Sequence, residues 1–259
     1  MVIPLDSYIL EEGFKKVLSE DRETQEHCIK EIASSMRKVD PSVIHNMGGV
    51  WIPNNEYMKE YWGPKILDPS FDCYTYEECN WSNNIIFPIR NVLGDIVGLV
   101  GYNPINKLLS EQEENFHLRV YRNTGRKFMD KGKYIFCRDG VIKEAIEEGY
   151  LIITDGLFDT ASANNEGLLA GALLGSNLSD EYKVILSFIK TIYIAEDNDK
   201  AGKNLARRLK AAHPDVRRLK FNKFKDLDDV LKSEYAEEFK RVFLTDLGNP
   251  VNKDIRFRF

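Results

Sequence analysis

Cysteine is scarce in this chain, and it follows no ligand pattern. The cysteines are scattered without a C-x-x-C pair, at Cys28, Cys73, Cys79 and Cys137. Because a zinc ribbon is built from such pairs, we expect no zinc in this protein. Cysteines without a pattern are typical of reduced thiols, so a cytoplasmic location is expected.

Long apolar runs are also absent. No hydrophobic run approaches the roughly 18 residues that span a bilayer. The N-terminal segment, MVIPLDSYILEEG, lacks the basic-then-apolar order of a signal peptide. We therefore expect no membrane partner. The 43% hydrophobic and 30% charged composition is instead typical of a globular protein with a substantial core.

A positive net charge is missing as well. The formal net charge of the 259 residues is −5, which ordinarily argues against nucleic acid as a partner. The charges are unevenly distributed, however, because bases gather in residues 119–133 and 200–225 while acids gather in residues 11–31 and 144–148. The net charge therefore does not exclude a nucleic-acid partner.

The sequence does contain two short apolar runs, and each is followed by acidic residues. Leu151–Thr154 and Thr191–Ala195 are rich in β-branched residues and are bounded by turn residues, which predicts buried strands. Helical patterns between them favour a mostly parallel sheet. Because the carboxyl ends of such strands share one edge, Asp155, Asp197 and Asp199 are expected to meet there. Oxygen ligands without nearby Cys or His suit Mg²⁺ or Mn²⁺ rather than zinc.

This stretch resembles the TOPRIM domain shared by DnaG-type primases, topoisomerases and some nucleases. In that family one strand ends in Glu-Gly, and a later strand ends in Asp-x-Asp followed by Ala-Gly at the start of a helix. Residues 197–202 read DNDKAG and match the second half, whereas Asp155 stands at the position of the general acid/base glutamate. The resemblance implies that Asp155 and Asp159 are catalytic residues.

Residues 85–102, IIFPIRNVLGDIVGLVGY, predict a β-hairpin in which Pro88 lies at an edge or a bulge. The hairpin resembles the Phe-Pro-Ile-Arg element in the N-terminal part of the DnaG polymerase core. This resemblance implies a nucleotide or template contact for Arg90. The family's closing arginine is replaced by Tyr102.

Residues 119–133, RVYRNTGRKFMDKGK, interleave bases with Tyr121 and Phe128. A charge run is by default a solvated face, but this interleaving is also typical of phosphate-binding grooves. The segment resembles the family's Lys-Tyr-Leu-Asn-Ser element. Together with Arg90 and Lys225, the residues thereby implied in nucleotide or nucleic-acid binding are Arg122, Asn123, Arg126, Lys127, Lys131 and Lys133.

The predicted strand Val216–Phe221 leads into KDLDD, residues 225–229, which resembles the family's Gly-Lys-Asp-Pro-Asp element. Side chains two residues apart in extended chain point the same way, so Asp226 and Asp228 are expected to face the metals together. The resemblance implies two or more Mg²⁺ or Mn²⁺ ions, with the ligands Asp155, Asp197, Asp199, Asp226 and Asp228.

The expected fold is α/β, with a TOPRIM-like, mostly parallel sheet flanked by helices and preceded by a smaller mixed α+β subdomain. Residues 5–38 predict one or two amphipathic helices, and residues 50–82 show no sustained period and are expected to be irregular or short-stranded. The expected domains are an N-terminal primase-core subdomain, a TOPRIM domain and a short helical tail, at residues 1–148, 149–232 and 233–259.

The resemblance covers residues 85–231 with four elements in the family's order, and it implies a DNA primase. Such an enzyme synthesises short RNA primers by metal-dependent nucleotidyl transfer. The implied partners are a single-stranded DNA template and ribonucleoside triphosphates, with the replicative helicase and a separate zinc-ribbon protein as further candidates. The chain resembles a pared-down core of the kind a bacteriophage encodes, which implies the host bacterial cytoplasm.

Two alternatives stay open. A TOPRIM nuclease would use the same metals to cleave a phosphodiester with water, and a catalytically weakened protein would only bind nucleic acid or the replisome. The hairpin and the basic segment favour the primase, because they resemble the polymerase core rather than TOPRIM domains in general. A topoisomerase is not expected, since 259 residues are too few for its gate domains.

Overall fold

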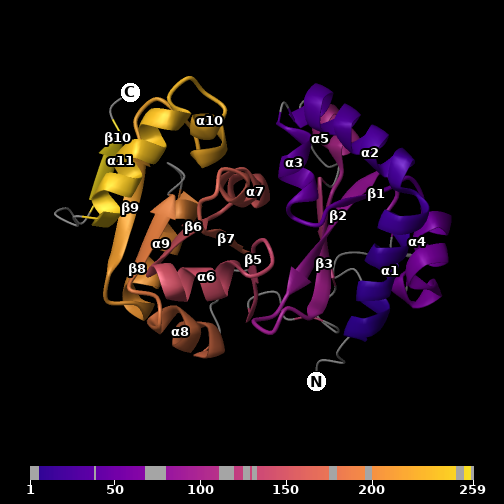
Figure 1. The fold of residues 1–259 in the computed structure, drawn as a ribbon, viewed down its shortest axis with the longest axis horizontal. Helices are drawn as coiled ribbons and strands as arrows, with labels where there is room; N and C mark the ends of the chain where they lie inside the picture. Colours follow the sequence, from indigo (N-terminus) through magenta and orange to yellow (C-terminus); the bar gives the residue numbers. More distant parts are fainter. Residues whose placement is uncertain are drawn as a thin grey trace. The chain divides into compact units, whose positions relative to one another are not determined.

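In the computed structural model the chain folds into two compact units, Met1–Lys131 and Gly132–Phe259 (Figure 1). The structure describes residues 6–37, 39–67, 80–110, 120–124, 129, 133–174, 180–195, 200–248 and 254–257. No helix in these ranges is long and apolar enough to cross a membrane.

The first unit opens with helices, as the periodicity predicts. They are α1 (Ser7–Glu20), α2 (Arg22–Glu31), a π-helical segment (Ile32–Arg37) and α3 (Pro41–His45). Asp6 caps α1, since its carboxylate accepts a hydrogen bond from the backbone N–H of Tyr8 at 3.0 Å. The apolar face of α1, with Leu10, Phe14 and Val17, is buried in the core of the unit.

Residues 50–67 are more regular than predicted. They form β1 (Val50–Ile52), α4 (Asn55–Trp62) and a 3₁₀ turn (Pro64–Leu67). The short strand agrees with the prediction of an irregular or short-stranded segment, whereas the helix α4 was not predicted. Two turns of helix have little stability of their own, and α4 is held by tertiary packing. Its Trp62 indole meets Phe14 edge-on and donates a hydrogen bond to the Leu10 carbonyl at 3.2 Å.

The predicted hairpin is confirmed. It consists of β2 (Asn84–Arg90) and β3 (Ile96–Tyr102). The sheet has the order β1-β2-β3-β4, with β4 (Tyr121–Asn123) at its edge, and α5 (Pro104–Ser110) lies between β3 and β4 in the chain. Pro88 lies beyond the part of β2 that pairs with β1, and the register shifts at Ile89/Arg90. The missing N–H of Pro88 therefore breaks no bond to β1.

The second unit is an α/β layer structure, as predicted. Its strands are β5 (Ile135–Phe136), β6 (Tyr150–Thr154), β7 (Ala170–Leu173), β8 (Thr191–Ala195), β9 (Val216–Phe221) and β10 (Asp254–Phe257), in the order β10-β9-β8-β6-β7-β5. All neighbouring pairs are parallel except β5 with β7.

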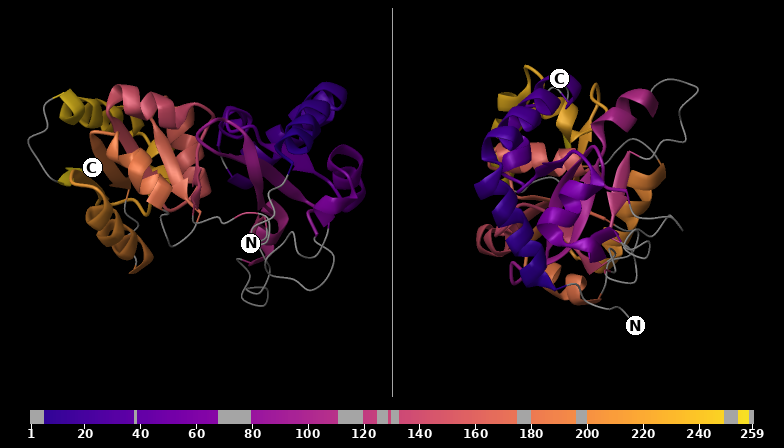
Figure 2. Two further views of the ribbon diagram at one scale, coloured as in Figure 1. Left: turned by 90° about the horizontal axis from the view of Figure 1, so that it is seen from below. Right: turned by 90° about the vertical axis from the view of Figure 1, so that its right-hand side faces the viewer.

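The helices of this unit are α6 (Val141–Glu148), α7 (Leu157–Asn165), α8 (Asp180–Ser187), α9 (Lys200–Ala212), α10 (Leu227–Leu231) and α11 (Ala236–Gly248). Figures 1 and 2 show α6 and α11 on one face of the sheet and α9 on the other. Strands buried between two helical layers read as continuous apolar runs, and every residue of β6 and β8 is buried.

The unit boundaries differ from the predicted ones. The division falls between Lys131 and Gly132 rather than after residue 148, because β5 pairs with β7 and Val141 and Ala145 of α6 join the core of the second unit. The helix α11 and the strand β10 do not form a separate tail either. The strand β10 extends the sheet, and Phe243 of α11 packs edge-on against the rings of Tyr150 and Tyr193.

Candidate active site

The candidate site lies at the carboxyl edge of the parallel sheet in the second unit. Asp155 directly follows β6 and is exposed, and Asp226 lies in the connection that leaves β9. Because β6, β8 and β9 are mutually parallel, their carboxyl ends share this edge. The prediction that these strands are parallel and end at one edge is therefore confirmed. That the acidic side chains after them meet there stays a prediction.

The turn after β6 is tight around Gly156. The hydroxyl of Thr154 donates to the Gly156 carbonyl at 3.0 Å and lies 2.7 Å from the hydroxyl of Thr160 in α7. A Cβ atom on Gly156 would lie 2.0 Å from Oδ2 of Asp159. The carboxylate of Asp159 thus packs against the turn, and the glycine allows this approach.

A direct hydrogen bond joins Asp159 and Asp228, a contact that the sequence does not reveal. The Oδ1 atom of Asp159 accepts a hydrogen bond from the backbone N–H of Asp228 at 2.9 Å. Asp228 is buried and accepts a hydrogen bond from the Ser162 hydroxyl at 2.6 Å, while its other oxygen lies 2.5 Å from Nζ of Lys232. These bonds join α7 to α10.

Asp226 and Asp228 do not share an extended segment. Asp226 is the N-cap of α10, and its Oδ1 accepts a hydrogen bond from the backbone N–H of Asp229 at 2.9 Å, whereas Asp228 lies in the first turn of the helix. The premise that both side chains point the same way is therefore wrong. A capping bond after residue 226 starts a helix at this position, and a helix separates side chains two residues apart.

The two carboxylates consequently differ in their electrostatic surroundings. Asp228 faces the ammonium of Lys232, whose side chain is 27% exposed, so much of its charge is balanced inside the protein. The carboxylate of Asp226 has a longer contact, 3.6 Å, with Lys225, whose side chain is 79% exposed. An ion pair with so exposed a partner is weak, which leaves Asp226 the better candidate for an external cation.

The predicted metal ligands Asp197 and Asp199 lie outside the described residues. Within the described ranges, no group of three or more His, Cys, Asp or Glu side chains is arranged to hold a metal ion. The chemistry of the donors nevertheless fits a hard divalent ion, since the acids at this edge, Asp155 and Asp226 among them, offer only oxygen atoms.

The predicted phosphate-binding residues fall in both units. Arg126, Lys127, Lys131 and the side chain of Asn123 lie outside the description. Arg122 is part of β4 in the first unit, whereas the exposed Lys133 and Lys225 belong to the second.

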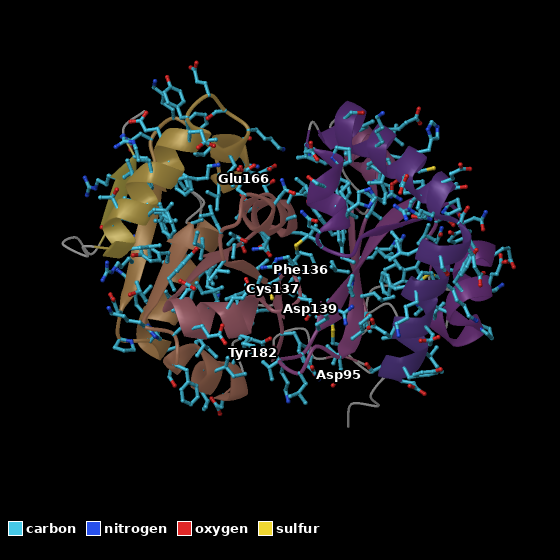
Figure 3. All side chains as sticks on the ribbon, viewed as in Figure 1. Asp95, Phe136, Cys137, Asp139, Glu166 and Tyr182 are labelled. Atoms are coloured by element: carbon cyan, nitrogen blue, oxygen red, sulfur yellow. The ribbon has the colours of Figure 1, made fainter. Side chains whose placement is uncertain are left out.

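Arg90 is engaged within the first unit. Its guanidinium donates to the Gly94 carbonyl at 2.6 Å and to Oε2 of Glu11 in α1 at 2.9 Å. The hairpin turn is held further by Asn91, whose amide donates to Oδ2 of Asp95 at 3.1 Å (Asp95 is labelled in Figure 3). Arg90 therefore fastens the hairpin to α1.

Sequence reasoning missed Thr154, Thr160, Ser162 and Lys232. Lys232 stands four residues after Asp228, a spacing that brings two side chains together on a helix, so this pair could have been found once α10 was expected. The contact of Ser162 with Asp228 joins residues that are 66 positions apart. No local pattern signals such a contact.

Comparisons with known proteins agree with this geometry. Residues 152–231 match the Toprim-like family. The chain is 32% identical to the DNA primase of Thermotoga maritima over 124 residues, which are 47% of this chain and 20% of that protein. It is 23% identical to the DNA primase of Aquifex aeolicus over 246 residues, which are 88% of this chain and 46% of that protein. The chain thus spans less than half the length of the curated relatives it matches.

The solved structures extend the likeness to both units. A DnaG primase catalytic domain bound to single-stranded DNA superposes with a TM-score of 0.64 at 15% identity, covering 93% of this chain and 80% of that one. The zinc-binding and RNA polymerase domains of the Aquifex aeolicus primase give 0.66 at 20% identity, covering 92% of this chain and 60% of that one. The chain has the fold of a DnaG-type primase core.

The resemblance predicted from the sequence is thereby confirmed. The match to the Toprim-like family begins in β6 and ends with α10, so it contains Asp155, Asp159, Asp226 and Asp228. A Toprim-like domain implies the use of a divalent metal ion in primases, in agreement with the oxygen donors at the carboxyl edge.

Proposed function

We propose that this chain is a primase-type nucleotidyltransferase, which synthesises short RNA primers on single-stranded DNA. The observation that carries the proposal is the fold likeness to primase cores over 93% of the chain, which includes the hairpin sheet of the first unit. The Toprim-like match alone covers residues 152–231 and would suit a nuclease equally well. The first unit is what favours primer synthesis.

In the proposed reaction, the 3′-hydroxyl of one nucleotide attacks the α-phosphorus of the next, and pyrophosphate leaves. Asp155 accepts the proton of the attacking hydroxyl, in the role that the resemblance implies for it. Asp159 is a positioning residue, since its carboxylate binds the backbone N–H of Asp228 and packs on the Gly156 turn. The position of the Asp155 carboxylate therefore depends on α7 and α10.

The metal site would be formed by Asp155 and Asp226, together with Asp197 and Asp199, which follow β8 in the sequence. When bound, Mg²⁺ or Mn²⁺ ions neutralise the charge that develops on the reacting phosphate and the leaving pyrophosphate. Asp228, which was predicted as a further ligand, is better suited to holding α7 and α10 in place, because both of its oxygens have partners in the protein. That the site binds two or more ions stays a prediction.

Phosphate groups of the template and the nucleotide would be bound by basic and polar side chains of the predicted set. Lys133 and Lys225 are exposed, and Arg122, Asn123, Arg126, Lys127 and Lys131 are further members of the predicted set. Arg90, also predicted, is less suited to this role because it bonds Glu11 and the Gly94 carbonyl. Single-stranded DNA as the template accords with the DnaG catalytic domain that was solved bound to it. The helicase, a separate zinc-ribbon protein, a bacteriophage origin and a location in the host bacterial cytoplasm stay predictions.

Primer synthesis by variants at position 155 tests the proposal. The purified chain would be incubated with single-stranded DNA, labelled ribonucleotides and Mg²⁺ or Mn²⁺, and the products resolved by length. We expect Asp155→Ala to lose activity by several orders of magnitude, whereas Asp155→Glu retains it, because the family ordinarily has glutamate at this position. Asp229→Asn, an exposed acid on α10, is the matched control and should keep full activity.

The outcome separates the candidate functions. Short ribonucleotide products made only in the presence of template support the primase, while nicked DNA in reactions without nucleotides would establish the nuclease instead. Equal primer yields from wild type and Asp155→Ala would refute the catalytic role of Asp155.

A further inference from the structure

A basic surface lies on the α9 side of the second unit, apart from the residues of the candidate active site. Lys203, Arg207 and Lys210 are exposed and lie four and three residues apart along α9. At 100° per residue they fall within one narrow stripe, opposite the buried Leu205 and Leu209. The stripe from Lys203 to Lys210 is about 10 Å long, at 1.5 Å per residue.

The neighbouring strands continue this surface. Leu219 and Phe221 of β9 are buried in the core on the α11 side, so Arg218 and Lys220 face the α9 side. In β10, Arg256 is the register partner of Lys220 and Asp254 is the register partner of Arg218, so these two side chains share the same face. The basic surface is therefore formed by Lys203, Arg207, Lys210, Arg218, Lys220 and Arg256.

One carboxylate contacts this surface without balancing it. Asp254 lies 3.2 Å from Nζ of Lys220 and 3.8 Å from Nε of Arg218. Although burial opposes ionisation, the bond from Lys220 and the charges of Arg218 and Lys210 hold the pKa of Asp254 below its ordinary value. Asp254 is thus charged at neutral pH, and the six cations with this one anion form a strongly positive surface.

The direction of the elements connects this surface to the candidate active site. The crossover helix α9 starts five residues after β8 ends at the carboxyl edge, and it leads back to the start of the parallel strand β9. Arg218 and Lys220 lie on β9 upstream of Lys225 and Asp226. A polyanion that leaves the carboxyl edge on the α9 side therefore passes over the basic surface.

The composition of the surface points to a duplex rather than a single strand. Proteins that bind single strands stack bases on exposed aromatic side chains, whereas duplexes are bound without sequence preference through their phosphates. Among the described residues, none of the exposed large hydrophobic side chains lies on α9, β9 or β10. The aromatic rings of these strands, Phe221 and Phe257, stack on each other on the opposite face.

We propose that the basic surface binds the phosphate backbone of a nucleic-acid duplex. In the proposed function, on which this identification rests, that duplex is the primer–template hybrid that leaves the active site. The surface makes no base contacts, so binding is independent of sequence and strongly dependent on salt. It retains the product close to the active site while the next nucleotide enters.

Fluorescence anisotropy with the full chain tests the proposal. The probes are an RNA–DNA hybrid, a DNA duplex and a single-stranded DNA of equal length, each titrated at several salt concentrations. We expect Arg207→Gln/Lys210→Gln to weaken duplex binding about tenfold and to lower the slope of log affinity against log salt by about 2. Arg256→Gln, on a different element, should lower the slope by about 1.

The matched control is Lys143→Gln/Arg241→Gln, which removes two exposed cations from α6 and α11 on the other face of the sheet. It should bind the duplexes like the wild type. Equal affinities and slopes for the control and the Arg207/Lys210 variant would overturn the proposal, as would an equal loss of single-strand binding, since the surface would then not select duplexes.

Failure of the proposed function would be recognised separately. Asp155→Ala should abolish primer synthesis and leave duplex binding unchanged. A wild type that makes no primers but loses duplex affinity on Arg207→Gln/Lys210→Gln would retain the binding surface and refute the primase. If the wild type makes primers but the Arg207→Gln/Lys210→Gln variant binds duplexes like the Lys143→Gln/Arg241→Gln control, the primase is supported and the binding surface is refuted.

Discussion

Asp228 is the residue through which the elements around the candidate active site are joined. Its backbone N–H binds Asp159 of α7, and its carboxylate contacts Ser162 of α7 and Lys232 at the end of α10. Removing one partner of a buried ion pair leaves the other charge without compensation. Asp228 is therefore expected to contribute to stability more than an active-site carboxylate usually does.

Asp228→Ala should lower the free energy of unfolding by about 3 kcal/mol, at the low end of the range for buried pairs, because the side chain of Lys232 is partly exposed. Urea denaturation followed by circular dichroism measures this. The control Asp229→Ala, on the exposed side of the same helix, should change the free energy by less than about 0.5 kcal/mol. A metal ligand among like charges would behave oppositely, because its removal from metal-free protein relieves repulsion. A gain in stability would thus contradict the positioning role.

At the scale of elements, the last helix and strand complete the second unit. The ring of Phe257 in β10 stacks on the ring of Phe221 in β9, and its centroid lies 4.8 Å from the ring centroid of Phe239 in α11. Just after α7, Glu166 (labelled in Figure 3) accepts a hydrogen bond at 2.8 Å from Lys240 of α11. The edge strand and the helix are therefore fastened to the sheet by one aromatic cluster and by an ion pair.

Phe257→Ala should destabilise the second unit by about 3–5 kcal/mol, because it removes a fully buried ring and leaves a cavity beside Phe221 and Phe239. Chemical denaturation monitored by far-ultraviolet circular dichroism would detect the shift. Phe188→Ala removes the same group from a side chain that is 66% exposed, and it should alter stability by no more than about 0.5 kcal/mol. Similar effects of the two substitutions would mean that β10 does not belong to the core.

The connection between α9 and β9 carries an acid-sensitive contact. Arg217, the second residue of β9, donates to Asp215 at 2.9 Å and lies 3.3 Å from Asp246 of α11. The bond from Arg217 holds the pKa of Asp215 below its ordinary value. A lowered pKa means that this contribution is present at neutral pH, above the unfolded value of about 3.9, and is lost as pH falls through the folded value.

Asp215→Asn should therefore lower the melting temperature at pH 7 and pH 5 by similar amounts, and the difference from wild type should shrink below about pH 4. The side chain is 39% exposed, so screening limits the effect to about 1 kcal/mol or less. Thermal melts of both proteins between pH 3 and pH 7 measure it. A difference that widens as the pH falls would contradict the assignment.

At the scale of the whole molecule, the two units have separate cores, and tryptophan fluorescence can follow the unfolding of one of them. All tryptophans, Trp51, Trp62 and Trp81, lie in the first unit, and Trp62 and Trp81 belong to its core. Tryptophan fluorescence therefore reports the first unit, while circular dichroism reports both.

Phe257→Ala should shift the circular dichroism transition and leave the fluorescence transition in place, because the substituted ring lies in the second unit. The reciprocal control is Phe14→Ala, which removes a buried ring beside Trp62 and should shift the fluorescence transition instead. Denaturation curves followed by both signals test this. Coincident shifts in both signals for either variant would show that the units unfold as one cooperative body.

The sequence by itself determined the local and strongly patterned parts of this protein. Apolar runs bounded by turn residues located β6 and β8, and the strand–turn–strand pattern around Pro88 located the hairpin. Alternation of strands and helices was enough to expect parallel pairing, because crossovers have one favoured hand. The ordered motifs were enough to expect a DnaG-type core. These features depend on residues that are close together along the chain, so they can be predicted from the sequence alone.

Tertiary structure alone decided the roles of several individual side chains. Arg90 pairs with Glu11 and Asp228 with Ser162, contacts between residues 79 and 66 positions apart. Likewise, α4 is held by packing on α1, and β10 belongs to the sheet through its pairing with β9. A short helix or strand is too weak to form from its own residues, and a buried charge takes its partner from whatever the fold brings near. Both depend on contacts between distant residues, which only the folded chain creates.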